Sequence, residues 1–250
     1  GIGGRAGTSG AAGSAGGATG AAGHGGGAAG GATGTGGAAA YNPCPTSGPC
    51  KILPLGDSIT WGIQYEGAYR VELFGRALMA NQKITYVGSL MDGPATVSGV
   101  AFPPDNEGHS GWTIDQVAGL IPSPALDGSP DIILLLIGTN DTYMTDPSGA
   151  PQRLATLLDK ILSMDTHALL VVSLITPYPS QAANVATYNE AIPPLIAARA
   201  VAGKHILIAD LNTGFNTSTM LSSDGIHPNQ TGYNFMGDTW YALIGGLFPK

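Results

Sequence analysis

Between residues 51 and 248 the sequence alternates five times between a short apolar run and a longer segment with helical spacing of its apolar residues. A run such as DIILLLIG has no polar face, as expected for a strand that is covered on both sides. This alternation predicts an α/β fold whose five-stranded parallel sheet carries helices on both faces. The predicted strands are 51–56, 84–90, 131–138, 168–175 and 205–211. The predicted helices are 68–80, 113–121 with Thr113 as N-cap, 150–164, 184–202 and 231–248.

Prolines conflict with this pattern at two places. Pro54 lies inside the first predicted strand, and proline fits poorly in a central strand because it has no N–H. Pro193 and Pro194 lie inside the fourth predicted helix, where we expect them to break or kink it.

The first 40 residues differ from the rest of the chain in composition. They contain 18 Gly and 13 Ala and no aromatic residue. Such a segment cannot bury enough apolar surface to offset the entropy lost on folding. We therefore predict a disordered Gly/Ala-rich linker at 1–40 and a single folded domain at 41–250. The linker is either a tether to a surface or another domain, or a dispensable tail.

Charge and hydropathy exclude two classes of partner. The formal net charge is −7, with only 10 Lys and Arg, and no basic stripe is present, which argues against nucleic acid binding. The apolar runs are too short to span a bilayer, so no transmembrane segment is expected.

The two cysteines, Cys44 and Cys50, lie in the turn-rich stretch NPCPTSGPC. This spacing favours a small disulfide loop over two free thiols, and a metal site would need more ligands than the stretch offers. A disulfide together with a Gly/Ala tether points to an exported, extracellular or cell-surface protein. The sequence has no dense His/Asp cluster, so we expect no metal.

Polar clusters fall where a parallel sheet collects its functional groups, outside the carboxyl ends of the strands. GDSIT, with Ser58, follows the first predicted strand, and GTND, with Asn140, follows the third. DNEGHSGWT, with Gly111, follows the second strand, and SSDGIHPN, with Asp224 and His227, precedes the last helix.

These residue types suit acyl transfer. A serine hydroxyl needs a base and a third group that orients the base, and Ser58, His227 and Asp224 supply that set. The Ser58 and Gly111 N–H groups and the Asn140 amide are candidate donors to an oxyanion. Each residue also has an ordinary explanation in a turn or a cap, but the complete set in this order does not.

The blocks GDSIT, GHSGWT, GTND and DGIHPN resemble, in order, the four blocks of the SGNH hydrolases, also called GDSL-type esterases. The resemblance covers the chain from about Lys51 to the C-terminus. It implies a three-layer, flavodoxin-like sandwich and serine chemistry without a cofactor. It also implies a Ser58–His227–Asp224 triad and an oxyanion hole formed by Ser58, Gly111 and Asn140.

A narrower resemblance is to carbohydrate esterase family 3, which includes acetyl xylan esterases. It is carried by KILPLGDSITWG, YR at 69–70, YVGS at 86–89 and NEGHSGWTIDQV at 106–117. It implies removal of acetyl groups from plant polysaccharide without a metal. One departure from the wider superfamily is Thr139, where many members have glycine, and we expect it to adjust the pocket without abolishing the oxyanion hole.

Other side chains near the motifs receive weaker assignments. Asp57 and Asp141 are expected to brace their loops by hydrogen bonds. His109, His167 and His205 are expected to be structural or exposed. Five aromatic residues are candidates either for stacking on sugar rings or for the core: Trp61, Tyr65, Trp112, Tyr143 and Tyr178.

The sequence thus predicts a secreted serine esterase that hydrolyses short acyl esters, foremost O-acetyl groups on xylan or a related polysaccharide, through an acyl-enzyme on Ser58. Two alternatives stay open. One is a lipase or thioesterase of the same superfamily, which the lack of a long apolar lid segment disfavours. The other is a non-catalytic polysaccharide-binding module, which the complete triad disfavours.

Overall fold

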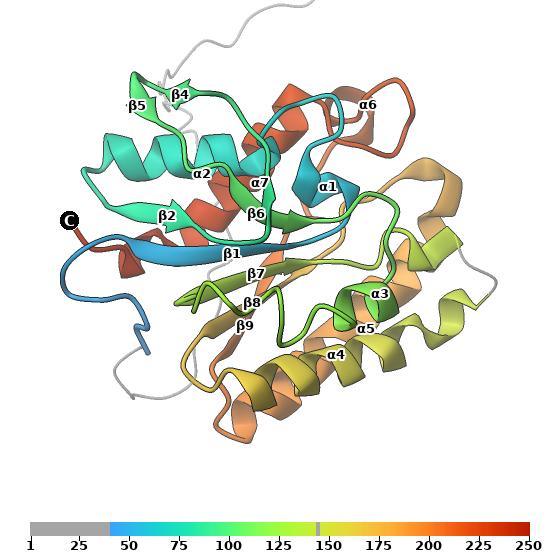
Figure 1. The fold of residues 1–250 in the computed structure, drawn as a ribbon. Helices are drawn as coiled ribbons and strands as arrows, with labels where there is room; N and C mark the ends of the chain where they lie inside the picture. Colours follow the sequence, from blue (N-terminus) through green and yellow to red (C-terminus); the bar gives the residue numbers. More distant parts are fainter. Residues whose placement is uncertain (1–40, 144–145) are drawn as a thin grey trace, which may run out of the picture. The chain divides into compact units, whose positions relative to one another are not determined.

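A mostly parallel sheet lies at the centre of the fold (Figure 1). The structure is a computed structural model that describes residues 41–143 and 146–250. The strand order is β3-β6-β1-β7-β8-β9, and β2 pairs with β1 on the same side as β6. The strands are β1 (Cys50–Gly56), β2 (Ile84–Tyr86), β3 (Leu90–Met91), β6 (Asp105–Gly108), β7 (Ile132–Leu136), β8 (Leu169–Leu174) and β9 (Ile206–Asp210). A separate hairpin consists of β4 (Thr96–Val97) and β5 (Val100–Ala101).

All five predicted strands are present, and they pair in parallel in the order β2-β1-β7-β8-β9. Their apolar side chains form the core; every residue of β7 is fully buried. The sequence did not predict β3, β4, β5 or β6. These strands are short, and β6 has the sequence DNEG, which carries no apolar signal.

Helices cover both faces of the sheet, which gives three layers (Figure 1). Helices α2 and α7 lie on one face, and α3, α4 and α5 lie on the other. The five predicted helices are confirmed, although the one that begins after Thr113 is shorter than expected and the last ends in a 3-10 turn. The helices are α1 (Ser58–Trp61), α2 (Ala68–Met79), α3 (Ile114–Ala118), α4 (Ala150–Met164), α5 (Ala182–Val201), α6 (Thr217–Met220) and α7 (Gln230–Ile244).

Pro54 lies in a central strand after all, because it falls where β1 changes partner. The Val87 N–H donates to the Ile52 carbonyl at 2.9 Å, just beyond β2, and the His109 N–H donates to the Gly56 carbonyl at 2.9 Å, just beyond β6. The backbone nitrogen of Pro54 points to this same side of β1, between the position bonded by Val87 and the position bonded by His109. Its missing N–H therefore costs no ladder bond.

Of the break or kink expected at Pro193 and Pro194, the break is wrong, since α5 continues through both residues from Ala182 to Val201. Both prolines lie on the exposed face of the helix. The carbonyl groups that lose a donor are those of Asn189 and Glu190, four residues before the prolines.

The start of the described chain is fixed to the amino end of the sheet. Cys44 and Cys50 are joined by a disulfide whose Cα atoms lie 4.9 Å apart, directly before β1. Tyr41 stacks on the ring of His205, which precedes β9, with ring centroids 3.4 Å apart. The predicted linker at 1–40 lies outside the described residues. Within 41–143 and 146–250, no helix is long and apolar enough to cross a membrane.

Candidate active site

Ser58 lies at the first position of α1, immediately after the carboxyl end of β1. Asp57 is the N-cap of this helix, and its Oδ1 accepts the Ile59 N–H at 3.0 Å. At the first helical position a backbone N–H has no acceptor within the helix, so the Ser58 N–H is free to bind a ligand. The Ser58 side chain is almost fully buried, with 5% of the residue exposed.

Asp224 and His227 lie in a closed loop between α6 and α7. The loop is fastened at its base, where the Ser222 N–H donates to the His227 carbonyl at 2.8 Å. Asp224 Oδ1 accepts the N–H groups of Ile226 at 2.9 Å and His227 at 3.0 Å. This turn holds the carboxylate and the imidazole in a fixed relation.

The predicted triad residues form a continuous chain of hydrogen bonds. His227 Nε2 lies 2.8 Å from Ser58 Oγ, and His227 Nδ1 lies 2.8 Å from Asp224 Oδ2. Burial raises the pKa of Asp224, but the hydrogen bonds from the Ile226 N–H and from the backbone and side chain of His227 together lower the pKa by more than burial raises it. The net shift of the pKa is therefore downward. The carboxylate is therefore ionised at neutral pH and only accepts hydrogen bonds, so the hydrogen between the two groups lies on His227 Nδ1, which donates it to Asp224 Oδ2. This leaves Nε2 to accept the proton of the Ser58 hydroxyl.

The loops that carry the predicted oxyanion donors follow β6 and β7, which are the neighbours of β1 at its carboxyl end, where Ser58 follows. Gly111 follows β6 in a turn closed by the Trp112 N–H, which donates to the His109 carbonyl at 3.1 Å. Gly111 has φ +80° at the third position of this turn, a conformation that favours glycine.

Asn140 follows β7 and reaches across to the Gly111 turn. Its Nδ2 donates to the Trp112 carbonyl at 2.8 Å, which uses one of the two amide hydrogens. The second hydrogen remains for a ligand. Thr139, by contrast, is 3% exposed and belongs to the packing beside Asn140.

Asp57 is fully buried beside the candidate nucleophile, and burial raises the pKa of its carboxyl to about 7, although the Ile59 N–H, the charge of His227 and the nearby Thr139 hydroxyl oppose the shift. Its Oδ2 has no hydrogen-bond partner within the described residues. Asp57 therefore braces the loop with one oxygen and carries a buried, unpaired second oxygen, which is costly when the group is ionised.

Replacing Asp57 with asparagine should make the protein more stable than wild type at neutral pH. In the folded wild type the carboxyl titrates near pH 7, and in the unfolded chain near its ordinary value of 3.8. Between these values the folded state holds more protons, so its stability falls as pH rises. Asparagine keeps the Oδ1 acceptor and has no such dependence. Urea unfolding should show a stability gain of Asp57→Asn that grows from pH 4 to pH 7 and then levels off; a gain that does not change with pH would contradict the shift.

Two further charged residues hold the loops around Ser58. Asp141 is buried, and it accepts the Ile114 N–H at 3.0 Å and the Arg153 Nε at 3.0 Å, so it braces its loop against α3 and α4, as predicted. Arg70 is fully buried in α2 and donates to the Asp92 and Pro104 carbonyls, each at 3.0 Å. Sequence reasoning missed Arg70, because its only signal was the pair YR in a family resemblance.

The aromatic candidates divide by exposure. Tyr178 is 1% exposed, and its hydroxyl donates to the Thr139 carbonyl at 3.2 Å, so it belongs to the core. Tyr143 is 43% exposed and stacks on Tyr178. Trp112 is partly exposed next to Gly111. Trp61 and Tyr65 are also partly exposed.

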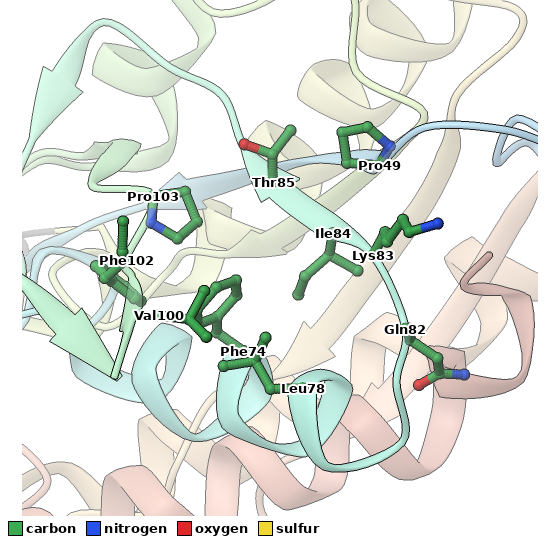
Figure 2. A pocket seen from close by; sticks show the side chains of 11 residues that line it. Pro49, Phe74, Leu78, Gln82, Lys83, Ile84, Thr85, Val100, Phe102 and Pro103 are labelled. Atoms are coloured by element: carbon green, nitrogen blue, oxygen red, sulfur yellow. The ribbon is translucent and has the colours of Figure 1, made fainter. Parts of the chain in front are cut away.

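No cluster of His, Cys, Asp and Glu in the described parts of the chain is arranged to hold a metal ion. A cavity of about 420 Å³ lies between α2, β2 and the segment after β5 (Figure 2). Pro49 and Ile84 place it at the amino ends of β1 and β2, whereas Ser58 follows the carboxyl end. The cavity is therefore separate from the candidate site.

A family model described as the GDSL-like Lipase/Acylhydrolase family matches residues 55–235. The "Multidomain esterase" of Ruminococcus flavefaciens is 32% identical over 236 residues, which cover 80% of this chain and 29% of that protein. The "Putative endoglucanase X" of Acetivibrio thermocellus is 31% identical over 130 residues, which cover 52% of this chain and 56% of that protein. The chain thus spans less than two thirds of the length of these curated relatives.

Two solved structures match this chain over nearly the whole of their own length, and their names agree with the family model. A structure described as a "Clostridium thermocellum family 3 carbohydrate esterase" has a TM-score of 0.70 and 34% identity, covering 80% of this chain and 97% of that one. A "carbohydrate esterase family 3 from Talaromyces cellulolyticus" has a TM-score of 0.69 and 28% identity, covering 79% and 98%. The chain therefore belongs to the GDSL-like lipase/acylhydrolase family, which confirms the class predicted from its motifs, that of a carboxylic ester hydrolase with a three-layer α/β fold.

Proposed function

We propose that this protein is an exported serine esterase that removes short acyl groups, foremost O-acetyl groups, from xylan or a related plant polysaccharide. The observation that carries the proposal is the chain of hydrogen bonds from Ser58 through His227 to Asp224, at 2.8 Å each. Its place at the carboxyl ends of β1 and its neighbours agrees with the position of sites in parallel sheets.

In the acylation step the Ser58 Oγ attacks the carbonyl carbon of the ester while His227 Nε2 takes the hydroxyl proton. The carbonyl oxygen becomes an oxyanion, which accepts hydrogen bonds from the Ser58 N–H, the Gly111 N–H and the Asn140 amide. The carbon–oxygen bond to the sugar then breaks, and His227 returns the proton to the departing sugar oxygen. Asp224 stabilises the imidazolium throughout.

In the deacylation step a water molecule attacks the acyl-enzyme. His227 Nε2 takes a proton from the water, and the same three donors stabilise the second oxyanion. The bond between the acyl carbon and Ser58 Oγ breaks, and the serine recovers its proton from His227. The product is a free carboxylic acid, and the enzyme returns to its starting state.

Replacing Asn140 with alanine should lower kcat for 4-nitrophenyl acetate by about 10²-fold to 10³-fold, with little change in KM, because the lost donor acts on the transition state. Initial rates measured over a range of substrate concentrations give kcat and KM. Asn234→Ala, on α7, serves as the control and should stay within about 2-fold of wild type. A change confined to KM would place Asn140 in ground-state binding instead.

The similarity to two structures named as family 3 carbohydrate esterases supports a sugar ester as substrate. A further similar structure is described as an acetyl esterase, at 26% identity and a TM-score of 0.68, which supports an acetyl group. The partly exposed rings of Trp112 and Tyr143 adjoin the loops of Gly111 and Asn140 and suit contact with a sugar face.

Acetate release from acetylated xylan, measured beside 4-nitrophenyl acetate, tests the substrate. We expect turnover of both. Hydrolysis of the small ester alone would remove xylan from the proposal and turn attention to other acetylated glycans. A chain-length series of 4-nitrophenyl esters with its maximum at eight carbons or more would favour a lipase, and xylan binding without any turnover would favour a binding module.

Export is supported by the Cys44–Cys50 disulfide, because such bonds persist in oxidising compartments. The Gly/Ala-rich residues 1–40 suit a tether to a surface or a further domain. Fractionation of cells that produce the protein should place it outside the cytoplasm.

A further inference from the structure

The end of β6 is pressed against the strand and helix that carry Ser58. Gly108 pairs with Gly56 of β1, and a Cβ on Gly108 would lie 2.3 Å from the Trp61 nitrogen in α1. His109 follows directly, and its N–H donates to the Gly56 carbonyl at 2.9 Å. The backbone of His109 is thereby fixed to the residue that precedes Asp57 and Ser58.

The side chain of His109 is held by a buried carboxylate two residues earlier. Glu107 is fully buried, and its Oε2 lies 2.7 Å from His109 Nε2. Its other oxygen accepts the Ser89 N–H at 2.6 Å. His109 is therefore the side chain that satisfies Glu107 Oε2 in this buried position. Buried carboxylates of this kind require a partner, so the position of the ring is strongly determined.

The His109 ring in turn fixes the loop that carries the oxyanion donors. It stacks on the Trp112 ring, with centroids 4.2 Å apart and planes 23° apart. The Trp112 backbone closes the turn around Gly111 through its N–H and accepts the Asn140 amide through its carbonyl. Both loop donors, Gly111 N–H and Asn140 Nδ2, therefore depend on where Trp112 lies.

We propose that Glu107 and His109 are positioning residues, whose hydrogen bond and whose contact with Trp112 hold the Gly111 and Asn140 donors at the oxyanion. The proposal rests on the proposed function, since it assigns these donors to the transition state. Its physical basis is the steep dependence of such stabilisation on geometry, where a displacement of 1 Å costs up to about 10²-fold in rate.

The test compares His109→Ala with His109→Gln in the full chain. Glutamine places an N–H close to the position of Nε2 and can keep the bond to Glu107, whereas alanine leaves Glu107 without it. We expect His109→Ala to lower kcat for 4-nitrophenyl acetate by about 10-fold to 100-fold with KM changed by less than about 3-fold. We expect His109→Gln to recover kcat to within about 5-fold of wild type.

Two controls separate positioning from misfolding. Rates are divided by the number of sites that a fluorophosphonate labels at completion, so that inactive molecules do not count. His205→Ala also removes an imidazole stacked on an aromatic ring, that of Tyr41, but at the amino end of the sheet. It should leave kcat per labelled site within about 2-fold of wild type.

The outcomes are distinct for the two proposals. If His109→Ala keeps kcat within 2-fold of wild type, or if His109→Gln is as impaired as His109→Ala, the positioning role is wrong while the serine mechanism stands. If Ser58→Ala is still labelled and active in the same assay, the proposed function itself is wrong.

Discussion

Ser58→Ala should lower kcat for 4-nitrophenyl acetate by about 10⁶-fold, to a residual rate set by binding and the oxyanion donors alone. The substitution removes the proposed nucleophile, and it removes the partner of His227 Nε2 at 2.8 Å. Because the side chain is small and alanine suits a helix, the fold should persist. The measurement is ester hydrolysis with purified variant and wild type, together with thermal unfolding.

Ser163→Ala is a matched control, since this serine lies on α4 and bonds only locally to the Lys160 carbonyl at 2.9 Å. It should retain wild-type kcat. An active Ser58→Ala protein with a normal melting temperature would refute the nucleophile.

Asp224→Asn should lower kcat by about 10³-fold to 10⁴-fold near neutral pH. The Oδ1 acceptor of the asparagine keeps the turn with the Ile226 and His227 N–H groups. Its amide NH₂, however, faces His227 Nδ1, whose hydrogen bond Asp224 Oδ2 accepts at 2.8 Å in the wild type. The imidazole then carries its proton on Nε2, and it can no longer accept the proton of Ser58.

Asp210→Asn is the control for the turn itself. Asp210 Oδ1 accepts the Asn212 and Thr213 N–H groups at 2.9 Å and 2.8 Å, which is the same local arrangement without an imidazole. Its kcat should stay close to that of wild type. A loss of less than 10-fold in Asp224→Asn would mean that the carboxylate does not orient His227.

The parallel sheet could be predicted from the sequence because each of its strands is an apolar run between helical segments. These strands are β1, β2, β7, β8 and β9. The sequence also predicted that the polar clusters lie close together, since the loops that follow parallel strands meet at one edge of the sheet. The 2.8 Å contacts among Ser58, His227 and Asp224 agree with that reasoning.

Features that depend on partners distant in sequence could not be predicted. β6 forms a strand because its backbone pairs with Leu55 and Gly56 of β1, although its own residues are polar. Pro54 is harmless only because of where β2 ends and β6 begins. His109 was expected to be structural or exposed, and only the positions of Glu107 and Trp112 show which groups its ring contacts.

One side of β1 pairs with β2 and then with β6. This arrangement separates a connection whose length can vary from the loop that carries Gly111. β2 pairs with β1 through Tyr86, and β6 pairs with β1 through Glu107, so lengthening the hairpin β4–β5 in the connection between them would shift neither β2 nor the Gly111 turn. Loop length contributes little to the free energy of folding. Apart from the Asp92 and Pro104 carbonyls that Arg70 binds, the hairpin β4–β5 in this connection is therefore a place where insertions can accumulate and new surfaces can be acquired, while the chemistry at the carboxyl end of β6 stays in register.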